Sequence, residues 1–142
     1  MGIKSSGSKP KIIKSESVIR NCPEMPSFSF KYLTTKKNFN FGKMVKGDKK
    51  EWQSALAERI IELSQNTWLY WFGLNKEQGI ETIYSSQLNF PPNNYSFSED
   101  EKVIVFRFNS QKGRIIGIKN NRSPIYYVIG LDTDYSAYDH GN

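Results

Sequence analysis

Cationic side chains dominate the stretch from Lys102 to Arg122, and they are the residues of this chain best suited to chemistry. Six of them fall there with no acid between them: Lys102, Arg107, Lys112, Arg114, Lys119 and Arg122. A guanidinium group can hold two phosphate oxygens at once, whereas an ammonium group acts as a point charge. The apolar runs 103–106 and 115–118 lie in the same stretch and predict buried strands. A sheet with such cations is a candidate surface for a polyanion.

An antiparallel meander of three strands, residues 102–108, 114–119 and 125–131, is predicted to position these cations. The connections 109–113 and 120–124 have the composition and length of hairpin turns. Pairing the last residue of each strand with the first residue of the next fixes which side chains share a face, because side chains alternate along a strand.

This pairing would gather Arg107, Lys119 and Tyr127 on one face and place Arg114 on the other, beneath the helices. A shift of one residue in either hairpin would redistribute these side chains. The predicted cationic face therefore depends on the register. The alternative is that basic residues at strand ends only protect a sheet edge from aggregation.

Helices that could cover the sheet precede the meander. Apolar side chains recur at helical spacing at Trp52, Leu56, Ile60 and Leu63, which predicts a helix over about residues 49–63. Asp48 offers its N-cap, and Glu51 completes a capping-box pattern. Glu58 and Glu62, with Arg59 nearby, are expected on its solvated face.

Further elements flank this helix. Ser64 or Thr67 can cap a second helix, from Trp68 to about Leu74, which is apolar around most of its circumference and should be buried. The alternation at residues 28–32 predicts a half-buried strand. Residues 75–101 fit either a strand or an irregular crossing, and residues 132–142 are expected to form a polar tail.

Composition bounds the class of protein. The 142 residues carry a net charge of +6, and residues 1–27 are rich in Ser, Lys and Pro. Such a segment buries too little apolar surface to offset its ordering entropy, so we expect a flexible basic arm, followed by a single domain over residues 28–142. Cys22 is the only cysteine, which excludes an intrachain disulfide and favours a cytoplasmic protein.

Other signals are weaker. No apolar run reaches the roughly 18 residues of a membrane helix. The start, Met1-Gly2-Ile3-Lys4-Ser5-Ser6, fits an N-myristoylation pattern, so a membrane-attached arm is a lesser alternative. Asp132, Asp134 and Asp139 have a spacing that suits turns better than a divalent cation site. No nucleotide-binding loop and no metal-spaced His/Cys set is present, and we expect no cofactor and no metal.

The order strand, helix, helix, three antiparallel strands resembles the RelE/ParE toxin superfamily. Short motifs carry the resemblance: Phe106-Arg107-Phe108, Gly113-Arg114-Ile115-Ile116, Tyr126-Tyr127-Val128-Ile129 and Tyr138-Asp139-His140. The same stretch is similar to prophage-type proteins that end in a Tyr-Asp-His tail. The resemblance implies an α+β fold, with two N-terminal helices packed on a small antiparallel sheet in the order β-α-α-β-β-β.

The resemblance also implies an activity, the cleavage of mRNA at the ribosome by attack of a 2′-oxygen on the adjacent phosphorus. Arg107 and Arg114 would stabilise the phosphorane, and Tyr138 or His140 would move protons. The residues expected to bind the nucleic acid are Lys112, Lys119, Arg122 and, by stacking on a base, Tyr127. An antitoxin or another protein inhibitor would be the partner.

The chain departs from this family in ways that keep other functions open. It is longer than such toxins, and Asp132 and Asp134 stand where the family often carries a basic residue or His. A non-catalytic nucleic-acid-binding or protein-binding regulatory domain is the main alternative. A basic-arm protein at a membrane is the third class.

Overall fold

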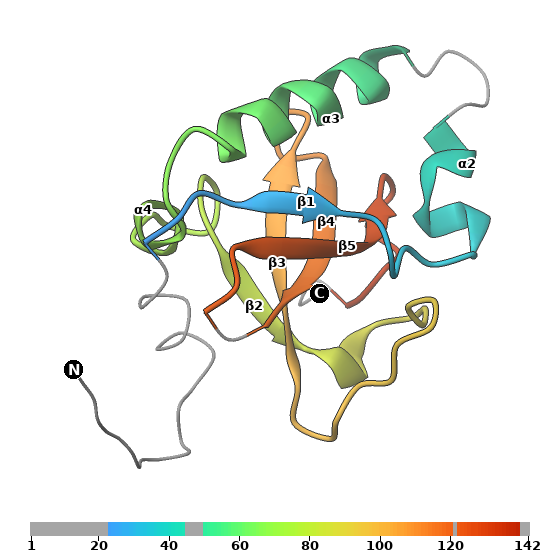
Figure 1. The fold of residues 1–142 in the computed structure, drawn as a ribbon. Coiled ribbons are helices and arrows are strands. Elements are labelled where there is room, and N and C mark those ends of the chain that lie inside the picture. Colours follow the sequence, from blue (N-terminus) through green and yellow to red (C-terminus); the bar gives the residue numbers. More distant parts are fainter. Residues whose placement is uncertain (1–22, 45–49, 121, 140–142) are drawn as a thin grey trace.

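A five-stranded sheet forms the centre of the computed structural model (Figure 1), with the strand order β1-β5-β4-β3-β2. The strands β3 (Lys102–Phe108), β4 (Gly113–Lys119) and β5 (Ile125–Asp132) form the antiparallel meander that the sequence predicts. β1 (Ser27–Ser29) pairs with β5 in parallel, and β2 (Glu81–Tyr84) pairs with β3 in antiparallel orientation. The mixed α+β class is therefore confirmed. Residues 75–101, which fit either a strand or an irregular crossing, contain β2, and this strand enlarges the expected sheet.

The structure describes residues 23–44, 50–120 and 122–139. Most of the predicted arm, the capping residue Asp48 and the terminal His140 lie outside the described residues. At the end of the arm, the backbone N–H of Trp68 donates to the carbonyl of Glu24 at 3.0 Å. Within the described ranges, no helix combines the length and the apolar character needed to cross a membrane.

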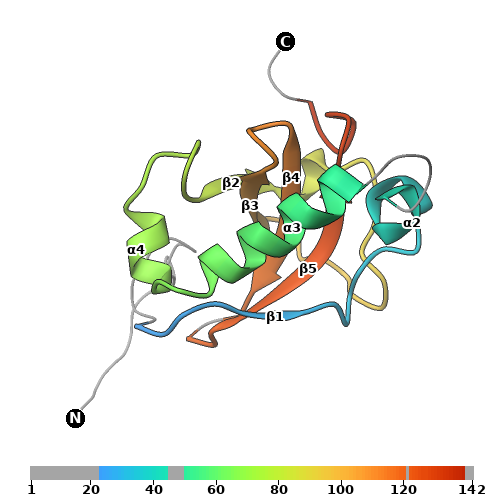
Figure 2. The same ribbon diagram turned by 90° about the horizontal axis from the view of Figure 1, so that it is seen from above.

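The helix α3 (Lys50–Leu63) lies across one face of the sheet (Figure 2), as the helical spacing of its apolar residues predicts. It is followed by the short helix α4 (Trp68–Phe72), whose N-cap is Thr67: its hydroxyl oxygen accepts from the N–H of Tyr70 at 3.1 Å. The indole N–H groups of Trp68 and Trp71 donate to backbone carbonyls at 3.0 Å. Both rings can therefore be buried without an unsatisfied donor.

The first core lies between the helices and the sheet. Its side chains include Leu56 and Leu63 from α3, both tryptophans of α4, and Phe106, Ile115 and Tyr126 from the strands. The hydroxyl group of Tyr126 donates to the carbonyl of Ile104 at 2.7 Å, so the ring can remain fully buried.

A second core covers the opposite face, which was expected to present cations to a ligand. Its side chains from irregular segments include Phe39 of η1 (Lys37–Phe39), Leu88 directly after η2 (Ser85–Gln87), and Phe90. The helix α2 (Phe41–Met44) follows η1. A Cβ added at Gly130 would lie 2.2 Å from Cζ of Phe90, so this ring packs directly on the backbone of β5. The expectation of an open cationic face is wrong.

The tail after β5 is also more ordered than a polar tail would be. Ala137 and Tyr138 are buried in the second core, and the N–H of Asn89 donates to the carbonyl of Ala137 at 2.8 Å. The expectation of a polar tail, with Tyr135 and Tyr138 in it, is therefore wrong for Ala137 and Tyr138, which pack in the core.

The register of each hairpin differs by one residue from the predicted pairing. Phe108 pairs with Gly113, so Arg107 lies opposite Arg114, and Lys119 lies opposite Tyr126. A bulge between Ile116 and Gly117 shifts the pairing further along β4. Because a slip of one residue exchanges the two faces of a strand, Arg114 joins Arg107 on the second face and Lys119 moves to the helix face.

Candidate functional site

Arg107 and Arg114 lie side by side on β3 and β4, directly opposite each other in the register. The side chain of Arg107 is 14% exposed, and Arg114 as a residue is only 6% exposed. They form the centre of a group that we call the arginine cluster, which consists of Glu81, Arg107, Gln111, Arg114 and Tyr138.

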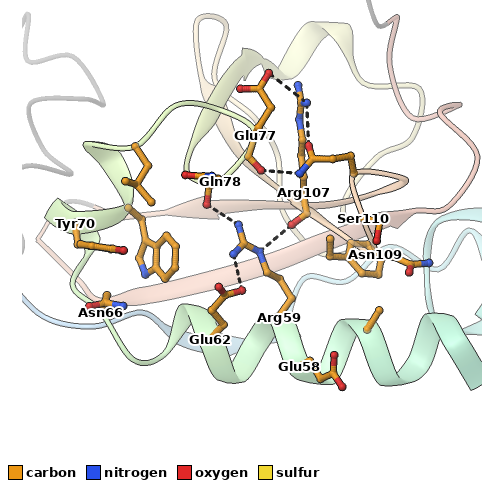
Figure 3. A pocket seen from close by; sticks show the side chains of 15 residues that line it. Glu58, Arg59, Glu62, Asn66, Tyr70, Glu77, Gln78, Arg107, Asn109 and Ser110 are labelled. Atoms are coloured by element: carbon orange, nitrogen blue, oxygen red, sulfur yellow. Dashed lines mark hydrogen bonds and ion pairs between the residues drawn. The ribbon is translucent and has the colours of Figure 1, made fainter.

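Arg107 is held by one amide and by two carboxylates. Its Nη1 donates to Oε1 of Gln111 at 3.2 Å. Oε2 of Glu77 lies 3.8 Å from Nη1, and Oε1 of Glu81 lies 3.7 Å from Nη2. Figure 3 shows Arg107 beside Glu77 at the wall of a pocket. The acids lie at ion-pair distance rather than at hydrogen-bond distance, so they neutralise this cation without engaging every donor.

Arg114 is held by backbone carbonyls. Its Nη1 donates to the carbonyl of Gln111 at 2.8 Å and to that of Gly113 at 3.0 Å. The ring of Tyr135 covers its guanidinium group, with the centroid 5.3 Å from Cζ, and the Tyr135 hydroxyl donates to the same Gln111 carbonyl at 3.2 Å. Gln111 and Tyr135 are exposed residues above a buried guanidinium group.

Some hydrogen-bonding capacity in the cluster is not used by the described residues. Nε of Arg107, Nε of Arg114 and Oε1 of Glu81 are buried, and none of them has a hydrogen-bond partner in the described part of the chain. Two donors and one acceptor are thus available at the centre of the arginine cluster for a polar group.

Tyr138 brings a protonated hydroxyl group to the same place. Burial raises the pKa of Tyr138, and the negative charge of Glu81 raises it further, while Arg114 and Arg107 act in the opposite direction. Because the net shift of this pKa is upward, the hydroxyl keeps its proton at neutral pH and can donate it.

Glu81 and Gln111 are the residues that sequence reasoning missed. Glu81 belongs to β2, where its pairing with Val105 places it on the face that also carries Arg107. Only this pairing between distant strands connects Glu81 with the arginines, so no local pattern could have revealed it. Gln111 lies in a turn, where a glutamine carries no recognisable functional signal.

Asp132 has a structural role after β5. Its Oδ1 accepts from the N–H groups of Asp134 at 3.1 Å and Ser136 at 3.2 Å, and its Oδ2 accepts from Ala137 at 3.0 Å. These bonds confirm that turn chemistry explains the aspartate spacing here. Among the residues that the structure describes, no group of three or more His, Cys, Asp or Glu side chains could hold a metal ion.

The cations expected to bind nucleic acid are not brought together. Nζ of Lys112 donates to Glu51 at 2.8 Å, Nζ of Lys119 lies 5.4 Å from the centroid of the Trp68 ring on the helix face, and Arg122 is exposed in the next turn. The ring of Tyr127 packs against Tyr32 at 5.0 Å. The predicted cluster of Arg107, Lys119 and Tyr127 on one face is therefore wrong. Of the predicted site residues that the structure describes, Arg107, Arg114 and Tyr138 lie together.

A pocket with a volume of about 700 Å³ opens on the other side of Arg107, between α3, the loop that carries Glu77 and the β3–β4 turn. Glu58, Glu62 and Glu77 contribute carboxylates to it (Figure 3). These carboxylates outnumber the two arginines of the pocket, so this pocket does not suit a polyanion.

Arg59 lines this pocket from α3, beside Glu58 and Glu62, which are exposed as expected of the solvated helix face. The side chain of Arg59 itself is only 10% exposed. Its Nε donates to the carbonyl of Arg107 and its Nη2 to that of Gln78, each at 2.8 Å, while Nη1 donates to Glu62 at 2.8 Å. Arg59 therefore donates to a backbone carbonyl of β3 that lies beyond the residues paired with β2.

No family model, no curated protein and no solved structure matches this chain.

Proposed function

We propose that this chain is a RelE-like RNA-binding protein whose arginine cluster contacts the phosphodiester backbone and cleaves it. The observation that supports the proposal is the pairing of Arg107 with Arg114 beside Tyr138. The motifs that carry the family resemblance contribute all three residues, although they are separated by up to about thirty positions. In the proposed β-α-α-β-β-β arrangement, α3 and α4 stand between β1 and the meander, and β2 is an addition.

The cluster contains the groups that cleavage of RNA by its own 2′-hydroxyl requires. In the proposed reaction, Glu81 accepts the proton of the 2′-hydroxyl, and the 2′-oxygen forms a bond to the adjacent phosphorus. Arg107 and Arg114 stabilise the charge of the phosphorane. Tyr138 donates its proton to the leaving 5′-oxygen, which gives a 2′,3′-cyclic phosphate and a free 5′-hydroxyl. The substrate is mRNA held by the ribosome.

A non-catalytic RNA-binding domain is the second candidate, and the burial of the cluster favours it. Arg114 is 6% exposed and Tyr138 is 3% exposed, and the ring of Tyr135 covers the guanidinium group of Arg114, so a phosphodiester reaches this group only if Tyr135 moves. The side chains of Arg107 and Glu81, at 14% and 20% exposed, remain partly reachable at the surface. In this alternative, binding depends on salt and no RNA is cut.

Isosteric variants can separate these proposals. We expect inducible expression of the wild-type chain in a bacterium to arrest growth and to leave RNA ends with 2′,3′-cyclic phosphates. Arg107→Gln, Glu81→Gln and Tyr138→Phe should each lower the cleavage rate about a hundredfold or more, because each removes a cation or a proton carrier. Lys76→Gln is the matched control for loss of charge, since this exposed residue lies outside the arginine cluster.

Circular dichroism of each variant establishes that the fold is intact. Harmless expression with intact RNA would exclude cleavage. Salt-dependent RNA binding that is weakened by Arg107→Gln would then support the non-catalytic domain. The absence of both cleavage and binding would contradict both candidates.

A further inference from the structure

Gln111 contacts both arginines of the cluster, one through its side chain and the other through its backbone. Its Oε1 accepts from Nη1 of Arg107 at 3.2 Å, and its Nε2 donates to the carbonyl of Glu77 at 2.9 Å. Its own carbonyl accepts from Nη1 of Arg114 at 2.8 Å and from the hydroxyl of Tyr135 at 3.2 Å. Among the described residues, Gln111 is the one that accepts hydrogen bonds from both guanidinium groups.

We propose that Gln111 is a positioning residue that holds the guanidinium groups of Arg107 and Arg114 at a fixed separation, so that both can contact one phosphodiester. This inference rests on the proposed function for its phosphodiester ligand, but the positioning itself can be tested without RNA.

The partners of the Gln111 amide determine its orientation. The guanidinium group of Arg107 can only donate, so it must face the amide oxygen. The carbonyl of Glu77 can only accept, so it must face the amide nitrogen. A residue that offers only an acceptor or only an apolar surface at position 111 cannot satisfy both neighbours. The side chain therefore fixes Arg107 against the loop that carries Glu77.

The turn directs the backbone carbonyl of the same residue toward Arg114. Asn109, Ser110 and Gln111 have φ angles of 54°, 52° and 74°, in the left-handed region that residues other than glycine seldom adopt. The N–H of Lys112 donates to the carbonyl of Asn109 at 3.0 Å and closes this turn. Uncommon backbone conformations of this kind persist where the surrounding structure over-determines them, and they cluster at functional sites.

The two arginines should respond differently when the amide is removed. In a Gln111→Met variant the backbone carbonyl remains, so Arg114 keeps both of its carbonyl acceptors. The guanidinium group of Arg107 loses its hydrogen bond to the amide oxygen and keeps the carboxylates of Glu77 and Glu81 at 3.8 and 3.7 Å. A freed guanidinium group rotates faster about its Cζ–Nε bond, which nuclear magnetic resonance of the guanidinium nitrogens measures directly.

The test therefore uses the full-length Gln111→Met chain. We expect the rotation of the Arg107 guanidinium to accelerate while that of Arg114 stays at its wild-type rate, and the affinity for single-stranded RNA to fall about tenfold. Gln111→Glu keeps the acceptor for Arg107, so rotation stays slow, but its negative charge should weaken RNA binding. Ser110→Ala is the control in the same turn and should change neither measurement.

Two outcomes are informative in opposite ways. Unchanged rotation of Arg107 in a folded Gln111→Met chain would overturn the positioning role of Gln111, whatever the affinity for RNA. If the wild-type chain binds no RNA but Arg107 is freed as expected, the proposed function fails and the positioning role is supported.

Discussion

At the scale of single residues, the arginine cluster shows how charges can be buried in a small domain. A buried cation is costly unless hydrogen bonds and opposite charges compensate for its lost hydration. Arg114 obtains two backbone carbonyls, and Arg107 obtains an amide and two nearby carboxylates. Because these partners come from two strands, β2 and β4, and from two turns, the cluster exists only when the sheet has formed.

Asp134 provides a pH-dependent contribution to stability. Burial acts to raise its pKa, but hydrogen bonds from Lys43 and Ser136 outweigh this effect and lower the pKa to about 2. Since the folded-state pKa lies below the unfolded value of 3.8, this contribution is complete above about pH 4 and is lost as the pH falls toward 2. Lys43→Met should reduce the pH dependence of the free energy of unfolding in this range.

The effect of Lys43→Met should be modest, because the Asp134 side chain is 45% exposed and solvent screens the pair. Chemical denaturation at a series of pH values between 2 and 6 measures it. Lys36→Met, at an exposed site, serves as control. Identical pH profiles for both variants would show that the pair with Asp134 carries no stability.

Individual site residues could be predicted from the sequence where the residue type alone indicates a chemical role. Arg107, Arg114 and Tyr138 were selected by residue type and by the resemblance, and the structure brings them together. Glu81 and Gln111 could not be predicted, because their relation to the arginines depends on strand pairing and on the path of a turn. His140 remains a prediction.

At the scale of elements, periodicity predicts α3 and the three meander strands to within about one residue at each end. The predicted register was wrong because Gly113 was assigned to the connection of residues 109–113. The positive φ angles of this connection fall on Asn109, Ser110 and Gln111. Gly113 belongs to β4, where a Cβ would lie 2.5 Å from the Phe108 ring and 2.8 Å from Trp52. A glycine required for close packing cannot be distinguished in sequence from a glycine required for a turn.

Arg59 connects α3 with the sheet, and its loss should affect both. Arg59→Met retains much of the apolar stem but leaves the carbonyls of Arg107 and Gln78 without this donor. We expect the free energy of unfolding to fall by about 1–3 kcal/mol, because hydrogen bonds from a charged donor are lost and the partly buried carbonyl of Arg107 is left without Arg59. Urea denaturation measures this loss. Glu58→Gln, on the exposed side of the same helix, should stay within about 0.5 kcal/mol of wild type.

Hydrogen exchange would locate the effect of Arg59→Met. The N–H groups at the end of β3 should exchange faster than those of β4 and β5. Uniform acceleration across the sheet, or wild-type stability, would contradict a specific link between α3 and β3.

At the scale of the whole molecule, two cores rather than one bury the central strands. α3 and α4 cover one face, while Phe39, Phe90 and Tyr138 from irregular segments cover the other. The helical core could be predicted because helices have a recognisable spacing of apolar residues. The second core could not, since irregular segments place their rings without any period. This is why a face expected to be open is closed.

The overall charge of the protein yields a prediction about RNA binding. The cluster supplies only two guanidinium groups, whereas the arm supplies further cations from outside the described residues. Each phosphate contact on a single strand changes the slope of log affinity against log salt by about 0.7. In the full-length chain, Lys9, Lys11 and Lys14→Gln together should flatten this slope by up to about 2 and weaken binding at low salt.

The same three substitutions should leave the cleavage rate at saturating RNA unchanged, because none of them belongs to the cluster. Fluorescence anisotropy with a labelled RNA at several salt concentrations measures the slope. A slope equal to that of the wild type would restrict the contacts with RNA to the folded domain.

The parallel pairing of β1 with β5 has a consequence for biosynthesis. These partners, Ser27–Ser29 and Ile125–Tyr127, are about a hundred residues apart, which makes their contact the most non-local of the sheet. A nascent chain emerges from its amino end, so the first strand waits until about a hundred further residues have been synthesised. During this time the segment up to β1 must not associate with other chains, and the abundant lysines that precede β1 suit that requirement.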